Sequence, residues 1–272
     1  MLITQTPLRI SLAGGGTDLP AYYKRHGGAV LNTAIDKYIY VILNKRFDDK
    51  IYISYSRKEI VDSVDDIKHE LVREAMRKAG VNNGLEIAIM ADIPSEGSGL
   101  GSSSSLTVGL LNAFYTYQGV IITAERLARE ACEIEIDICG KPIGKQDQYI
   151  AAYGGLNFLE FHPDGSVTVA PLALKVEKQE LGARLMLFYT NITRSSNPIL
   201  REQTDNSVKK EESLDNIKQL SYDVKAAILA GNYDEIGPIL KENWRLKKEM
   251  ASCITCPEID EMVEKALHGG AT

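Results

Sequence analysis

A run of glycine and serine, residues 97–105 (GSGLGSSSS), contains the residue types that can hold a phosphate group. Glycine adopts positive φ angles and lets the backbone approach a ligand closely. Successive backbone N–H groups can then point inward and bind an anion, while serine hydroxyls can bind phosphate oxygens or Mg²⁺. We therefore predict that this loop binds ATP. Its predicted binding residues are Gly97, Ser98, Gly99, Leu100, Gly101, Ser102, Ser103 and Ser104.

The segments on either side of this loop favour the same interpretation. Residues 84–93 alternate as a half-buried strand does, and residues 106–119 form an apolar run of helical length that ends in glycine. In the order strand, loop, helix, the N–H groups at the helix start bind an anion. A flexible linker has a similar composition, but a linker would not usually separate such a strand from such a helix. The spacing excludes the GxxxxGK, GxGxxG and GxSxG loops.

Two motifs of this sequence resemble those of the GHMP kinase family, which includes galactokinase, homoserine kinase and mevalonate kinase. Residues 7–18 (PLRISLAGGGTD) resemble the galactokinase-type pattern P-x-R-x-x-L-x-G-x-x-T-D, and residues 94–104 (PSEGSGLGSSS) resemble the family's ATP loop. Residues 7–23 and 27–41 look most like the D-glycero-D-manno-heptose 7-phosphate kinases, and fucokinases share a similar segment. The resemblance implies a sugar kinase that uses ATP and Mg²⁺ to phosphorylate an anomeric hydroxyl.

The resemblance also implies roles for particular side chains. Glu135, with Ser103 or its neighbour Ser102, would ligate Mg²⁺, and Asp147 would face the acceptor hydroxyl as a base or as a positioning group. Judged without the family, Glu135 belongs to an acidic series typical of a solvated face, and Asp147 could cap a helix. Arg9 would either neutralise charge on the transferred phosphoryl group or orient Asp147.

The substrate is expected to contact the first motif and a basic residue elsewhere. Gly16, Thr17 and Asp18 match the sugar-binding segment of galactokinase-like enzymes, although an aspartate in such a turn is often only a cap. A second phosphate on the sugar needs a cationic partner, and arginine suits bidentate phosphate contacts. The candidates are Lys141, Lys145, Arg194 and Arg201, of which we predict Lys145 and Arg194 as substrate residues.

The resemblance implies an α+β fold of two domains. The N-terminal ATP-binding domain would be similar to a domain of a small-subunit ribosomal protein, and the C-terminal domain would be ferredoxin-like. We place the boundary near residue 180, which gives domains 1–180 and 181–272, with a strand expected at 184–190. The glycine-rich third motif of the family is missing before the chain ends in HGGAT. We therefore expect the C-terminal domain to be truncated.

Composition limits the other classes of function. The chain of 272 residues has 31 basic and 37 acidic side chains, without the basic excess of a nucleic-acid-binding protein. It has neither a secretory signal pattern nor an apolar run of the ~18–20 residues that span a membrane, so the cytoplasm is the expected location. Cys253 and Cys256 form a lone CxxC, which favours reduced thiols over a zinc site. The oligomeric state stays open, with a homodimer among the options.

Two alternatives to a heptose 7-phosphate kinase remain open at this point. The acceptor could be fucose or another unphosphorylated sugar, because fucokinases share the first motif. The chain could also be a non-catalytic sensor of sugar or ATP, like the galactokinase-like transcriptional inducers. The presence of both Glu135 and Asp147 favours an enzyme over a sensor.

Overall fold

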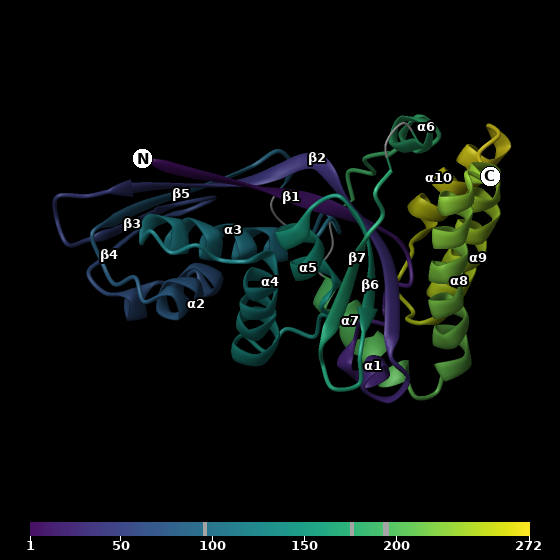
Figure 1. Cartoon of the computed structure of the whole chain (residues 1–272), viewed down its shortest axis with the longest axis horizontal. Coiled ribbons are helices and arrows are strands. Elements are labelled where there is room, and N and C mark those ends of the chain that lie inside the picture. Colours follow the sequence, from purple (N-terminus) through teal and green to yellow (C-terminus); the bar gives the residue numbers. More distant parts are fainter. Residues whose placement is uncertain (95–96, 175–176, 193–195) are drawn as a thin grey trace. The chain divides into compact units, whose positions relative to one another are not determined.

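The computed structural model describes residues 1–272 except 95–96, 175–176 and 193–195 (Figure 1). Contacts divide the chain into two compact units. Unit 1 consists of Met1–Ile10 and Ala34–Gly155, and unit 2 consists of Ser11–Thr33 and Leu156–Thr272. Unit 1 therefore contains the predicted ATP loop and both predicted acidic residues, whereas unit 2 contains the predicted sugar segment. The domain boundary near residue 180 stays a prediction.

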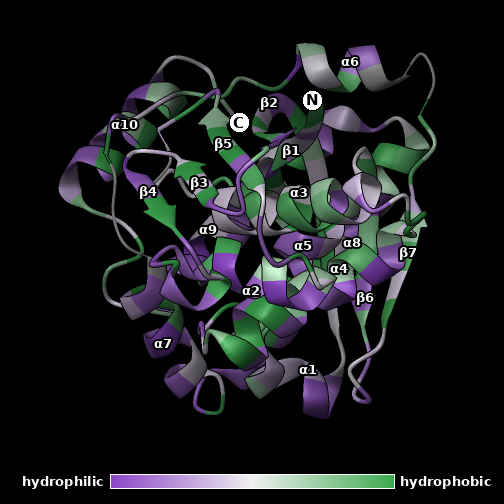
Figure 2. Cartoon of the chain, turned by 90° about the vertical axis from the view of Figure 1, so that its left-hand side faces the viewer, coloured by the Kyte–Doolittle hydropathy of each residue, from purple (hydrophilic) through white to green (hydrophobic). Residues whose placement is uncertain are grey.

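The sheet of unit 1 contains the second half of β2 (Gly28–Lys45) together with β3 (Ile51–Ser54), β4 (Lys58–Val61) and β5 (Leu85–Ala91). β5 runs antiparallel to β2, with Ile39 opposite Ala91, and parallel to β3. β1 (Leu2–Ala13) also pairs with β2. These strands are rich in Ile, Val and Tyr, the residues that fit a pleated, half-buried surface. The hydrophobic colour of β3 and β5 in Figure 2 reflects this composition.

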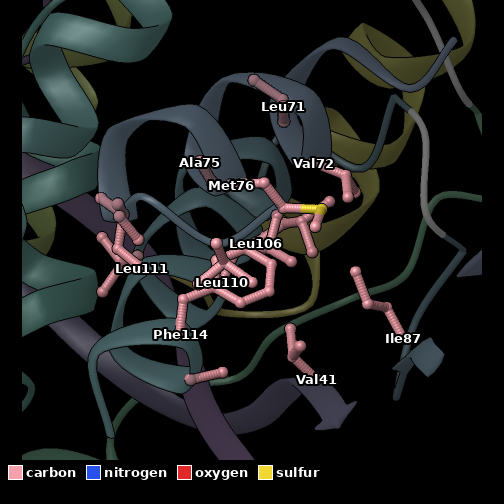
Figure 3. Packing of buried hydrophobic residues seen from close by; sticks show 14 of the residues in the cluster. Val41, Leu71, Val72, Ala75, Met76, Ile87, Leu106, Leu110, Leu111 and Phe114 are labelled. Carbon is pink, nitrogen blue, oxygen red and sulfur yellow. The ribbon is translucent and has the colours of Figure 1, made fainter. Parts of the chain in front are cut away.

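Helices pack against this sheet and bury the core of unit 1. They are α2 (Glu70–Ala79), α3 (Ser102–Tyr117), α4 (Ala124–Cys132) and α5 (Gln146–Tyr153), and a π-helix at Glu133–Ile138 continues α4. Met76 of α2 and Phe114 of α3 pack with Val41 and Ile87 from the sheet (Figure 3). Each such side chain contributes roughly 1.5–3 kcal/mol when it is fully buried. This core fixes the start of α3, where the ATP loop ends.

Unit 2 combines antiparallel strands with helices. The first part of β2 pairs with β6 (Leu156–Phe161), which pairs with β7 (Val167–Pro171). The helices are α1 (Pro20–His26), α6 (Glu177–Ala183), α7 (Ser196–Asn206), α8 (Glu211–Ala230), α9 (Ile236–Glu249) and α10 (Pro257–His268). Tyr22 of α1, Leu214 of α8 and Leu246 of α9 share one buried cluster. The mixed sheet and the helices of the two units confirm the predicted α+β class.

Residues 184–190 differ from the sequence prediction. The segment follows α6 without forming a strand, and Met186 and Phe188 are 75% and 68% exposed. A strand needs a neighbour to satisfy its backbone groups, and no strand in the described part of the chain pairs with this segment. Its apolar, β-forming composition alone therefore does not make it a strand. Across the described ranges, no helix is long and apolar enough to cross a membrane.

Candidate active site

The ATP loop has the backbone geometry that its glycines predict. Gly97, Gly99 and Gly101 have φ angles of 71°, 72° and 76°, in the left-handed region that other residues rarely adopt. They alternate with Ser98 and Leu100, which have no positive φ. Gly101 is the N-cap of α3, so the loop leads directly into the N–H groups at the start of a 16-residue helix. This arrangement can bind an anion.

The serines at the start of α3 contact Glu135, as the predicted metal site requires. The exposed Ser103 donates a hydrogen bond from Oγ to Glu135 Oε1 at 2.7 Å. The buried Ser104 donates from Oγ to Glu135 Oε2 at 2.6 Å. Ser104 is predicted to bind ATP, and its hydroxyl is engaged by Glu135. Of the two serines considered as metal ligands, Ser103 is therefore favoured over Ser102 by its bond to Glu135.

Glu135 lies on the π-helix and is completely buried. The burial overturns the alternative that it belongs to a solvated acidic face, whereas its neighbour Asp137 is exposed. Gln148 Nε2 donates to Glu135 Oε2 at 2.8 Å, and Lys141 Nζ lies 3.6 Å from Glu135 Oε1. A π-helix is rare and often occurs at functional sites. Nothing in the residue pattern distinguishes this segment from an ordinary α-helix.

The environment of Glu135 can accommodate a divalent cation. Burial raises the pKa of its carboxyl, while Lys141 and the hydrogen bonds from Ser104, Ser103 and Gln148 act in the opposite direction. Mg²⁺ takes oxygen ligands in an octahedron that phosphates and water usually complete. Glu135 Oε1 and the exposed Ser103 Oγ are adjacent oxygens at the start of α3, beside the loop. The donor set therefore fits Mg²⁺ bound together with nucleotide phosphates.

Arg9 and Asp147 form a bidentate ion pair on another side of the loop. Arg9 Nε lies 2.7 Å from Asp147 Oδ1, and Nη2 lies 2.8 Å from Oδ2. The third guanidinium nitrogen of Arg9, Nη1, donates to the Gly99 carbonyl at 2.7 Å. Asp147 stands in the first turn of α5. Of the two roles considered for Arg9, these contacts favour the one that orients Asp147, and they also attach this pair to the loop.

Gly101 lies close to both partners of this ion pair. A Cβ atom at Gly101 would be 3.2 Å from Arg9 Cγ and 3.3 Å from Asp147 Oδ2. The loop therefore has Glu135 on the side of Ser103 and Asp147 on the side of Gly101. One carboxylate can serve a metal ion while the other serves an acceptor group.

The predicted sugar segment forms a tight turn in unit 2. Asp18 is 2% exposed and accepts a hydrogen bond at Oδ1 from the Gly16 backbone N–H at 2.9 Å. Thr17 donates to the Gly14 and Ala29 carbonyls and accepts from the Ala29 N–H. A side chain at Gly14 would overlap the Ala29 carbonyl oxygen, so the turn requires glycine there. Asp18 therefore stabilises the turn through its side chain, as the alternative to sugar binding proposed.

The basic residues proposed for a second phosphate have different outcomes. Lys145 directly precedes α5, whereas Arg194 lies outside the described residues. Lys247 of α9 is not among the residues predicted from the sequence, and its Nζ donates to the Gly15 carbonyl at 2.7 Å and to Gln203 Oε1 at 3.3 Å. Lys247 is one of several lysines on a surface helix, so no sequence pattern distinguishes it. It brings a positive charge to the predicted sugar segment.

The cysteines add no further site. Cys132, Cys139, Cys253 and Cys256 are free thiols. Among the residues that the structure describes, no cluster of three His, Cys, Asp or Glu side chains is arranged to hold a metal ion. The Ser103–Glu135 pair is a different kind of site, in which substrate phosphates would supply most ligands.

The chain is similar to several known kinases. The sequence model described as GHMP kinases N terminal domain matches residues 67–155. The D-glycero-alpha-D-manno-heptose 7-phosphate kinase of Campylobacter jejuni is 36% identical over 98% of this chain and 83% of its own length. The L-fucokinase/L-fucose-1-P guanylyltransferase of Bacteroides fragilis is 26% identical over 96% of this chain and 32% of its length. The crystal structure of a D-glycero-D-manno-heptose 1-phosphate kinase from Bacteroides thetaiotaomicron has a TM-score of 0.79 and 31% identity, covering 91% of this chain and 80% of that one.

Proposed function

Because this chain belongs to the GHMP kinase family, we propose that it transfers the γ-phosphoryl group of ATP to the anomeric hydroxyl of D-glycero-D-manno-heptose 7-phosphate. The observation that carries the proposal is the pair of carboxylates on either side of one phosphate loop. Glu135 is bound to Ser103 at the start of α3, and Asp147 is bound to Arg9 beside Gly101. The substrate is taken from the heptose kinase relative, which matches nearly the whole chain.

Each part of this site has a task in phosphoryl transfer, which depends on positioning and on neutralising charge. The backbone N–H groups of Gly97–Gly101 and the start of α3 would bind the ATP phosphates. Ser103 and Glu135 would hold Mg²⁺, which supplies positive charge to the phosphate oxygens when it is bound. Asp147, fixed by Arg9, keeps a lone pair on each oxygen for the acceptor hydroxyl. It would accept that hydrogen bond, either as a base or as a positioning group.

The sugar side of the proposal rests on unit 2 and on the cations. The turn at Gly16, Thr17 and Asp18 would bind sugar hydroxyls. Lys145, Arg194 and Lys247 are the candidates for the 7-phosphate. Lys247 is favoured by its position against Gly15, because a phosphate needs a cation close to the sugar segment.

A substrate panel tests the acceptor. ADP release is measured with D-glycero-D-manno-heptose 7-phosphate, L-fucose and D-galactose, and we expect kcat/KM for the heptose to exceed the others by about 100-fold or more, since a site built for a charged group strongly rejects substrates that lack it. Lys247→Met should raise KM for the heptose 7-phosphate. Turnover of fucose with an inert heptose would refute the proposed acceptor. Binding of a non-hydrolysable ATP analogue without ADP release from any sugar would favour a sensor.

A further inference from the structure

The two carboxylate oxygens of Glu135 have partners of different kinds. Oε2 accepts hydrogen bonds from Ser104 and Gln148, whose side chains are 1% and 0% exposed. Oε1 has the exposed Ser103 at 2.7 Å and the ammonium of Lys141 at 3.6 Å. The buried donors therefore fix Oε2, whereas the partners of Oε1 are near solvent. Only Oε1 can exchange its partners without rearranging the core.

Lys141 lies between two carboxylates. Its Nζ is 3.6 Å from Glu135 Oε1 and 3.3 Å from Glu70 Oε1 on α2. Glu135 is fully buried, while the Glu70 side chain is 50% exposed. The Lys141 side chain is 16% exposed and ends in a compact charge on a flexible stem. A small rotation would move the ammonium from one acid to the other.

A buried carboxylate needs a positive partner, because an unpaired charge is costly to keep out of water. Before any metal binds, Lys141 is the cation nearest Oε1 among the described contacts. A metal ion on the same oxygen would repel the ammonium across a few ångströms in a poorly solvated site. The ammonium would then have to withdraw, and Glu70 is already within reach.

We propose that the ammonium of Lys141 neutralises Glu135 as a stand-in cation until a divalent metal binds. The metal displaces the ammonium, and Glu70 then retains it. The inference rests on the proposed metal site of Ser103 and Glu135 and adds a competitor that sets its affinity. Lys141 was also a candidate for the sugar phosphate. Its position between two carboxylates favours the metal-linked role, because both neighbours would repel a phosphate.

The proposal predicts effects of opposite sign. Lys141→Met removes the competitor, so metal binding tightens by about tenfold, at the lower end of the changes made beside metal ligands. Glu70→Gln removes the acid that retains Lys141, so metal binding weakens by about the same factor. In the double variant, Glu70→Gln has no further effect, because its target is absent. Such non-additivity separates a hand-over from long-range charge effects, which would add.

The readout is the Mg²⁺ dependence of binding of a non-hydrolysable ATP analogue, measured by calorimetry at pH 8, so that no turnover is needed. Lys141→Arg should behave like the unchanged protein. The matched control is Lys78→Met, which removes the same charge from an ion pair between α2 and the π-helix, Lys78–Glu133 at 2.6 Å, without contacting Glu135. Thermal melts confirm that each variant is folded.

The outcomes distinguish this inference from the proposed function. The stand-in role alone would be refuted by a lower Mg²⁺ affinity in Lys141→Met or by an unchanged Mg²⁺ affinity. Additive effects in the double variant would also refute it. A change in Lys78→Met as large as in Lys141→Met would refute it too, since general charge would then explain both. Analogue binding that ignores Mg²⁺ in the unchanged protein would refute the metal site itself, and this inference with it.

Discussion

Replacing Asp147 by asparagine tests the proposed transfer step most directly. The change keeps the shape of the side chain but replaces one oxygen by an NH₂ group facing Arg9. Of the two bonds at 2.7 and 2.8 Å, one is lost, while Arg9 keeps its bond to Gly99. A hydrogen bond to a charged group contributes about 1.5–3 kcal/mol. Because the side chains are 13% and 22% exposed, we expect a loss of only about 1–2 kcal/mol in the free energy of unfolding.

The expected loss of turnover is much larger than this loss of stability. Without a carboxylate, the acceptor hydroxyl loses its negatively charged partner, and positioned acid–base groups typically contribute about 10²–10⁴-fold to the rate. A domain with a stability of about 5–15 kcal/mol stays folded after losing ~1–2 kcal/mol. Nucleotide binding should therefore survive while kcat falls.

The assay compares ADP release, binding of a non-hydrolysable ATP analogue and thermal unfolding for Asp147→Asn and for Asp137→Asn. Asp137 is an exposed carboxylate on the π-helix and controls for the change in charge. Turnover within threefold of the unchanged protein would refute the role of Asp147. A fall in kcat that merely follows the loss of folded protein would refute it as well, since the residue would then be structural.

Two further changes test the loop and the pH dependence. Gly101→Ala places an alanine at a φ of 76° with its Cβ 3.3 Å from Asp147 Oδ2, so the ATP analogue should bind more weakly and the melting temperature should fall. The control is Gly119→Ala, at a φ of 74° with open space around it, which should lower only the melting temperature. Equal affinities of the two variants for the ATP analogue would contradict the expected contact between the new Cβ at Gly101 and Asp147. Burial lowers the pKa of His69 below its usual value, so the unfolded chain takes up a proton first and the free energy of unfolding falls below about pH 6.5. In urea titrations His69→Asn should flatten this decline, and an unchanged decline in His69→Asn would refute the assignment.

Local features of the site could be predicted from the sequence, but long-range contacts could not. The residue types themselves predict the positive φ of Gly99 and the helix that begins after Gly101, because no other residue type adopts that backbone easily. The pairing of Ser103 with Glu135 came from the family resemblance, since no pattern relates positions so far apart. Lys247 depends on how α9 packs in unit 2, which no local pattern describes.

At residues 184–190 the local sequence predicted a strand that the structure does not contain. Its composition is apolar and β-forming, yet β structure is completed by a neighbouring strand that the segment itself cannot specify. The π-helix is another example. Six residues at 133–138 that look like ordinary helix form a π-helix, in which Glu135 is buried and bonded to Ser104 of α3. In both places the surroundings decide the local structure.

The π-helix also makes the site unusually sensitive to changes of chain length. A π-turn holds one residue more than an α-turn. Deleting a single residue from Glu133–Ile138 would let the turn close as α-helix and rotate the chain beyond it by about 100°. Glu135 and Asp147 would then no longer face the same loop, although no functional side chain had been replaced. Among related sequences, the number of residues between these two acids should therefore vary less than the residues themselves.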